Sequence, residues 1–359
     1  RKSFIEIIIK GFFRNMINFT LFENQPIGIE AKLTSDYLDL DQILSGNYGA
    51  SVSSEEYSFS ISPNLFLNFD CEIKFLKFRR LEARNIKGTL KVKEQLALGK
   101  DFTAHAMGGD VKISGMVNAR NANDIQVDTE AELNGINIDS MFFVFENFKQ
   151  TFLVDENLKG QIYANISTEM SFNNKLVLNS DSLISDVMVS IKDGELNDFE
   201  PMKKLAKYVS DESDLARLKF SELNNDIHIE NKVIYLPQME VSSNITTISL
   251  SGTHTFNQDI DYRVIAPLKR KKISDKDEAF GAIEDDGEGG AKIYLRIKGT
   301  TSDYKVTYDI QEVRKKIIAD LKNEVKELKT AFRDKGKKKK KVVELNSDEY
   351  FDWDNKKKN

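Results

Sequence analysis

Residues 161–166 read Gln-Ile-Tyr-Ala-Asn-Ile, and this stretch decides the fold class. Apolar Ile162, Ala164 and Ile166 alternate with more polar neighbours, so every second side chain points to the same side of an extended chain. Such period-two alternation is typical of a β-strand with one apolar and one polar side. It predicts a sheet that buries only one of its sides.

The same alternation recurs further along the chain, interrupted by short polar turns. The alternating apolar positions are Val187, Val189, Ile191, Ile227, Ile229, Ile248, Leu250, Ile293, Leu295 and Ile297. Polar turns are expected at residues 192–194 and 230–232. Because short turns join neighbours in sequence, these strands are predicted to pair mostly antiparallel. The expected fold class is therefore mainly β, built on an antiparallel sheet.

Three short helices are expected among the strands. Four residues, Ala31, Leu33, Leu38 and Asp39, recur as Ala131, Leu133, Ile138 and Asp139, at an offset of 100 residues. Each copy leads from an alternating strand into a helix-like segment, with Asp39 or Asp139 as the N-cap. The third helix follows Pro201 and carries Met202, Leu205 and Val209 on one side. The matching copies indicate an internal duplication.

Composition limits the possible functions. The chain has 359 residues, of which 40% are apolar and 30% charged, and its net charge of −5 gives no support for nucleic-acid binding. No stretch approaches the roughly 20 uninterrupted apolar residues of a membrane-spanning helix. Because the chain opens with Arg1 inside an apolar pattern, it is expected to be a fragment, with any signal peptide or membrane anchor upstream.

The residue types that carry catalysis form no recognisable motif. His105, His228 and His254 are scattered without metal-ligand spacing, and His228 is expected on the polar, solvated side of its strand. Cys71 sits in an apolar run and is expected to be a buried structural thiol. Gly108-Gly109 is expected to form a bulge or a tight bend. No enzyme activity, catalytic residue, cofactor or metal site is therefore predicted.

The apolar side of the sheet is the candidate functional site. A sheet that stays open and curls lengthwise would form a groove that keeps lipid tails out of water, at roughly 0.8 kcal/mol per methylene. The residues expected to line this groove are Ile162, Ile166, Val189, Ile191, Ile227, Ile229, Ile248, Leu250, Leu295 and Ile297. The alternative is that this apolar side is only the core of the sheet.

Two segments depart from the strand pattern. Residues 268–291 hold a basic and then an acidic run, which predicts a mobile loop. Residues 310–336 are predicted to form an amphipathic helix, followed at 337–359 by a basic and then acidic-aromatic tail. The expected docking residues for a partner or a membrane are Val313, Ile317, Leu321, Val325, Leu328, Phe332, Lys337, Lys341, Tyr350, Phe351 and Trp353. Alternatively, the helix caps the end of the sheet and the lysines form a solvated linker.

Four ordered stretches resemble the C-terminal region of the AsmA-like family, in the form found in Bacteroidota-type bacteria. They are 102–115, with its double glycine; 189–202, with its Asp-Gly and Phe-x-Pro elements; 220–223 through 234–243 and 250–256; and 293–300. The likeness covers roughly residues 25–310 and keeps the order throughout. After residue 310 the chain departs from the shared pattern, and it is shorter than the bridge-length relatives.

The resemblance implies an elongated, curved, taco-like β-sheet with an open apolar groove, divided into halves at 1–120 and 121–309. Relatives of this kind are anchored in the inner membrane by an upstream helix and reach into the periplasm. They are linked to phospholipid movement toward the outer membrane and to outer-membrane assembly. The family has no catalytic residues to carry over.

Two functions remain open from the sequence. The first is a non-enzymatic cell-envelope protein whose groove binds or conducts phospholipid, or another acyl lipid, between the inner and outer membranes. The second is a scaffold or accessory subunit of a periplasmic or outer-membrane complex, whose sheet is only structural. The two differ in whether the apolar side stays open or is filled by the protein's own side chains.

Overall fold

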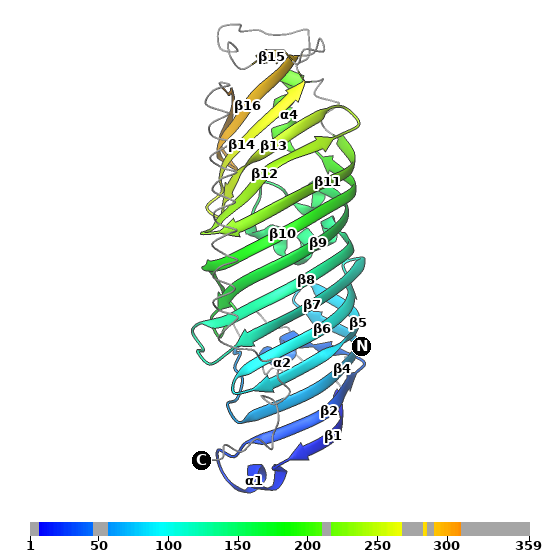
Figure 1. Ribbon diagram of the computed structural model, residues 1–359, viewed down its shortest axis with the longest axis vertical. Coiled ribbons are helices and arrows are strands. Elements are labelled where there is room, and N and C mark those ends of the chain that lie inside the picture. Colours follow the sequence, from blue (N-terminus) through cyan, green and yellow to red (C-terminus); the bar gives the residue numbers. More distant parts are fainter. Residues whose placement is uncertain (1–6, 46–56, 210–216, 268–282, 286–290, 310–359) are drawn as a thin grey trace. The chain divides into compact units, whose positions relative to one another are not determined.

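The computed structural model describes residues 7–45, 57–209, 217–267, 283–285 and 291–309. The predicted fold class is confirmed within these ranges. The protein is mainly β, its strands are curved and pair mostly antiparallel in an open sheet, and its described helices are short (Figure 1). The helix expected at 310–336 and the tail expected at 337–359 lie outside the described residues.

The chain divides into two compact units, and each has its own strands and apolar cluster. The described part of unit 1 falls within 7–132 and 166–183, and that of unit 2 within 133–165 and 184–309. Three strands contribute residues to both units, because the boundaries fall inside them. They are β8 (Ile125–Asn137), β9 (Leu158–Phe172) and β10 (Leu178–Asn197).

Unit 1 is built on an antiparallel β-meander, and two further strands pair in parallel with its first strand. Its further strands are β1 (Ile7–Arg14), β2 (Ile27–Ser35), β3 (Leu38–Asp39), β4 (Leu65–Phe78), β5 (Leu81–Lys93), β6 (Leu96–Ala106) and β7 (Gly109–Asn118). Each strand from β4 to β7 pairs antiparallel with the next, and β1 pairs antiparallel with β2. By contrast, β2 and β3 pair with β4 in parallel. The bend expected at Gly108-Gly109 is a tight hairpin turn, in which Met107 and Gly108 have positive φ.

Two helices complete the described part of unit 1: α1 (Met16–Leu21) and α2 (Leu40–Ser45). Asp39 caps α2 as expected, because its Oδ1 accepts a hydrogen bond from the backbone nitrogen of Gln42 at 3.2 Å. Leu40 and Ile43 of α2 pack against the buried cluster around Ile73. These contacts hold α2 on the sheet.

Unit 2 is a run of antiparallel pairs. Its further strands are β11 (Arg217–Glu230), β12 (Val233–Ser242), β13 (Thr247–Thr255), β14 (Asp259–Pro267), β15 (Ile283–Asp285), β16 (Ala291–Thr300) and β17 (Tyr304–Tyr308). Successive pairing runs from β10 to β14, and β16 pairs with β14, β15 and β17. The turn expected at 230–232 is a hairpin turn with Asn231 and Lys232 at positive φ. Of the loop expected at 268–291, only β15 and the first residue of β16 are described.

The turn expected at 192–194 is wrong. Strand β10 continues through these residues and stays in one register with β11, from the pair Lys192–Glu222 to the pair Gly194–Phe220. Asp193 has a φ of 51° inside the strand, so the Asp-Gly sequence makes a kink and not a chain reversal. Ile191 and Leu196 both contact the same apolar cluster although they differ by an odd number of positions. The kink therefore exchanges the two sides of the strand.

The expected helices of the second half are found, with one correction. Besides α3 (Ile138–Val144), this part holds two short 3-10 turns, η2 (Glu146–Lys149) and η3 (Asp155–Asn157), and α4 (Glu200–Val209). The N-cap predicted at Asp139 is wrong, because α3 begins at Ile138, directly where β8 ends. The helix expected after Pro201 is confirmed as α4, with Met202 and Leu205 buried.

Candidate functional site

One side of the unit 1 sheet carries almost only apolar side chains. Residues that pair directly across two strands point to the same side of a sheet. One line of paired residues crosses six strands: Phe13, Ile29, Leu67, Val92, Ala97 and Val117. The next line along the strands is Gly11, Ala31, Phe69, Leu90, Gly99 and Gly115. We call these two lines the unit 1 apolar face.

The opposite side of the same sheet is charged. Glu72 accepts a hydrogen bond from Lys32 of the neighbouring strand, with 2.6 Å between Oε2 and Nζ. The second carboxylate oxygen of Glu72 lies 4.0 Å from Nζ of Lys87. The hydrogen bond from Lys32 lowers the pKa of Glu72, and a bond to Asp36 raises the pKa of Lys74. These side chains remain well exposed, so this side of the sheet faces water.

Exposure varies along the unit 1 apolar face. Phe69 and Val92 are each only 5% exposed, whereas Phe13 on β1 is 46% exposed. Leu67 and Leu90 lie between these extremes and are half-buried. The face is therefore shielded at its centre and accessible toward β1.

Unit 2 also gathers its apolar side chains on one side. The pairs Leu250–Val264 and Val264–Leu295 put three strands in line, and Ile297 is two residues from Leu295 on the same side. Ile229 of β11 pairs with Ile234 of β12, and Ile234 pairs in turn with His254 of β13. His254 and Leu250 lie on the same side of β13. Eight residues of the predicted groove share this side by register: Val189, Ile191, Ile227, Ile229, Ile248, Leu250, Leu295 and Ile297.

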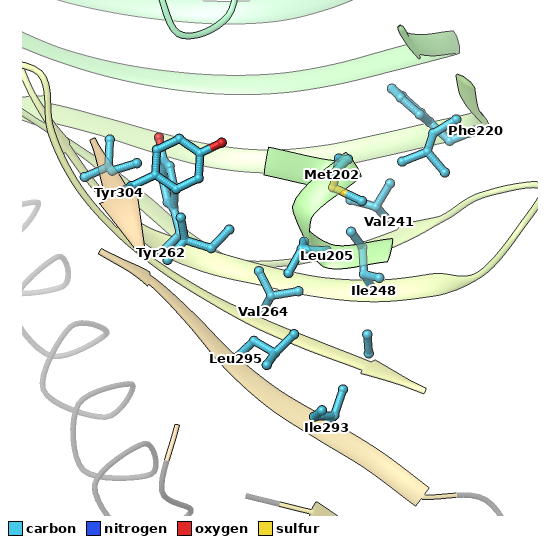
Figure 2. Packing of buried hydrophobic residues seen from close by; sticks show 14 residues of the cluster. Met202, Leu205, Phe220, Val241, Ile248, Tyr262, Val264, Ile293, Leu295 and Tyr304 are labelled. Atoms are coloured by element: carbon cyan, nitrogen blue, oxygen red, sulfur yellow. The ribbon is translucent and has the colours of Figure 1, made fainter. Parts of the chain in front are cut away.

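Part of this side is closed by the protein itself. Met202 and Leu205 of α4 pack onto Val241, Ile248 and Val264 of the sheet, as Figure 2 shows. Phe152, which precedes η3, stacks on the ring of Tyr262 at 6.1 Å and meets that of Tyr304 edge-on at 6.0 Å. Leu295, with no exposed surface, and Ile297, 3% exposed, therefore belong to a closed core.

The remainder of this side keeps partial exposure. Val189, Ile191, Ile227 and Ile229 are half-buried, and they lie on β10 and β11, whereas the buried core residues gather toward β14 and β16. We call these four residues the unit 2 open strip. A polar residue, Asn225, interrupts the strip opposite Val189.

The two remaining predicted groove residues both lie on β9, but in different units. Ile162 is 3% exposed within unit 2. Ile166 is half-buried within unit 1. The predicted docking residues, from Val313 to Trp353, lie outside the described residues.

The histidine prediction is wrong at His228. It lies on the polar side as expected, but its side chain has no exposed surface. Asp186 and Tyr235 pair with it from the strands on either side and flank the ring, with 2.9 Å between Nδ1 and the Asp186 carboxylate. A second carboxylate, Glu230, lies 3.7 Å from Nε2. Cross-strand neighbours therefore bury a residue that strand phase alone assigns to solvent.

Cys71 and His254 are also buried, each inside one unit. Cys71 is buried as expected, and burial raises the pKa of its thiol to about 11. His254 lies 3.0 Å from the Tyr262 hydroxyl, and burial lowers the pKa of its imidazole. Burial therefore keeps Cys71 as the unreactive neutral thiol and His254 as a neutral imidazole beside a tyrosine hydroxyl.

Within the described ranges, no group of His, Cys, Asp and Glu side chains is arranged to hold a metal ion. No helix among the same residues is long and apolar enough to cross a membrane. Comparison with protein-family models, with curated proteins and with solved structures finds no match.

Two features were missed by reasoning from the sequence. The unit 1 apolar face could have been found, because Leu67, Phe69 and Cys71 alternate with the polar residues Asn68 and Asp70. The exposed apolar residues around α1 are harder to find from the sequence. It shows that they are apolar, but it does not show that they stay exposed among the described residues.

Proposed function

We propose that this chain belongs to a non-enzymatic cell-envelope protein whose apolar sheet faces bind the acyl chains of phospholipid. The observation that carries the proposal is the unit 1 apolar face, where paired residues keep an unbroken apolar line across six strands. A charged opposite side leaves only this side available to an apolar ligand. The resemblance to AsmA-like proteins implies the same use of such a face.

The energetics favour a ligand of this kind. Six strands spaced by about 4.8 Å make an apolar strip roughly 24 Å wide. A tail of ~16 carbons gains on the order of 12 kcal/mol when its methylenes leave water. Half-buried side chains such as Leu67 and Leu90 would exchange their remaining contact with water for contact with the tail.

A scaffold function is the second candidate, and unit 2 favours it. There, α4 and Phe152 already cover much of the apolar side, and Leu295 has no exposed surface. A face filled by the protein's own side chains serves stability and leaves less room for a ligand. Under this alternative, both units are structural parts of an envelope complex.

Photo-crosslinking can test the lipid proposal at neighbouring positions. A photoreactive phenylalanine analogue would replace Leu67 on the apolar face or, as a matched control, Asn68, the next residue on the opposite side. After irradiation in cells, we expect phospholipid adducts at residue 67 and few at residue 68. Circular dichroism of both variants checks that each retains its β-structure.

The outcome also separates the two candidate functions. Equal labelling at both positions, or no lipid adduct at either, would falsify the binding role of the unit 1 apolar face. Protein adducts at residue 67 would favour the scaffold function. Native mass spectrometry of the purified chain gives an independent reading, because bound phospholipid adds a discrete mass.

The proposed location follows from the resemblance. AsmA-like relatives are held at the inner membrane by an upstream segment and extend into the periplasm toward the outer membrane, and we propose the same for this chain. Fractionation of cells that make the whole protein tests the location. Recovery in the cytoplasmic fraction would contradict it.

A further inference from the structure

A short stretch near the start of the described chain exposes an unusual amount of apolar surface. Seven of its side chains are 46–77% exposed: Phe12, Phe13, Met16, Ile17, Phe19, Leu21 and Phe22. We call this set the α1 tip, since it comprises α1 and the residues on either side of it. Monomeric proteins rarely leave a contiguous apolar patch of this kind in water, so the tip marks a contact surface.

Four of the six residues of α1 are apolar, and the other two are Asn18 and Thr20. None of the six residues of this helix is buried among the described residues, and all six are exposed. An amphipathic helix that docks into a protein groove shows one apolar face and one polar face. In α1 both polar side chains are bonded locally while the four apolar ones are exposed, and this combination suits contact with lipid.

The polar side chains of this stretch make local hydrogen bonds. The amide of Asn15 donates to the Pro26 carbonyl at 2.8 Å, and that of Asn18 donates to the Asn15 side chain at 2.7 Å. The hydroxyl of Thr20 donates to the Met16 carbonyl at 2.7 Å. Because a polar group that keeps its hydrogen bonds is far less costly to remove from water, these contacts prepare the tip for an apolar environment.

Charge is also sparse at the tip. Between Gly11 and Phe22 the only charged residue is Arg14, which lies 3.6 Å from Glu30 of β2. The tip thus presents apolar side chains and internally bonded polar groups to its surroundings.

We propose that the α1 tip inserts into the surface layer of a lipid membrane. The proposal rests on the proposed lipid-binding function, because Phe13 belongs both to the tip and to the first line of the unit 1 apolar face. A tail leaving the membrane at α1 would therefore meet the apolar face on the adjoining strand. The sparse charge indicates that insertion is apolar and does not need an anionic lipid.

Flotation with phosphatidylcholine vesicles tests the insertion. The variant combines Ile17→Ser with Leu21→Ser, on side chains that are 74% and 68% exposed and so contribute little to folding. The control combines Val177→Ser with Met188→Ser, both 57% exposed but outside the tip. We expect the vesicle partition coefficient of the tip variant to be lower than that of the wild-type protein by about tenfold or more. The control variant should partition like the wild-type protein, and a high-salt buffer should leave the partition coefficient of the wild-type protein unchanged.

Three outcomes would overturn the proposal. They are wild-type protein that does not float, a tip variant that floats like the control, and a concentration-dependent dimer that the tip variant dissociates. The last result, from light scattering, would assign the tip to a second copy of this chain. Crosslinking at residue 67 reports on the unit 1 apolar face alone. Lipid adducts at residue 67 without flotation would therefore reject membrane insertion of the α1 tip and leave the proposed lipid-binding function standing.

Discussion

Gly194 of β10 lies directly against the ring of Phe220 on β11. A Cβ atom at residue 194 would come within 2.1 Å of the Phe220 ring carbons Cε2 and Cζ. The two residues are cross-strand partners, and Phe220 is buried in the unit 2 cluster. Glycine is thus required at this position by the close approach of an aromatic ring.

Gly194→Ala should destabilise the protein by about 1–3 kcal/mol, because the packed ring cannot move aside freely. Phe220→Leu relieves the contact, so the double variant should lose less stability than the sum of the two single variants. Urea denaturation of the four proteins measures this coupling. Additive losses would show that the ring is not what excludes a side chain at residue 194.

Leu205→Ala should destabilise unit 2 by about 2–5 kcal/mol, since this α4 side chain is 2% exposed and its removal leaves a cavity over the sheet. Glu240→Ala, at an exposed position on β12, is the control and should change stability by less than about 0.5 kcal/mol. Thermal denaturation compares them. Equal midpoints would contradict the closure of the sheet by α4.

Ile229→Asn should weaken phospholipid capture if the unit 2 open strip carries acyl chains, because a polar amide would face the tail. Met188→Asn is the matched control on the opposite side of the sheet, where Met188 pairs with Asp226. Lipid bound per protein, measured after extraction, should fall only for Ile229→Asn. An equal fall for both variants would point to lost folding rather than a lost contact.

The buried thiol of Cys71 predicts a loss of stability at alkaline pH. Its pKa is about 11 in the folded protein against 9.0 in the unfolded chain, so the neutral thiol is favoured by folding. The contribution is complete below pH 9 and is lost as the pH rises toward 11. Cys71→Ala should remove this part of the pH dependence. A thiol reagent should label Cys71 rapidly only after denaturant is added, and rapid native labelling would contradict its burial.

The buried imidazole of His254 predicts the opposite trend at acidic pH. Burial lowers its pKa from the usual value near 6.5, so below that pH the unfolded chain takes up a proton before the folded protein does. Stability should therefore fall as the pH drops below about 6.5. The free energy of unfolding of the wild-type protein should thus fall between pH 7 and pH 5. In His254→Gln the part of this fall that comes from His254 should be absent. A fall of the same size in the variant would assign it to other groups.

Strand phase explains how much of the fold the sequence could predict. Alternation at Ile248-Leu250 and at Leu295-Ile297 reports directly which side each side chain takes, and the observed register puts these residues on one side. Alternation holds no information about what covers that side. The closure by α4 depends on contacts between Leu205 and residues more than forty positions away, such as Val264.

The errors have the same origin. The Asp193-Gly194 sequence has the composition of a hairpin turn, but pairing with β11 on both sides of it keeps the chain extended. Likewise, His228 is buried by Asp186 and Tyr235, which come from neighbouring strands. In both cases a partner distant in sequence overrides a local preference, and one sequence read locally does not reveal that partner.

The tight hairpins of unit 1 have a consequence for folding kinetics. Strands β4 to β7 are joined by turns of two residues, so their contacts close small loops and should form quickly. The parallel pairing of β2 with β4 instead closes a loop that contains α2 and residues up to 64, which carries a larger entropic barrier. We expect the meander to act as the nucleus and β1 and β2 to dock later, so that the edge strand next to the α1 tip is the last part of unit 1 to become protected from hydrogen exchange.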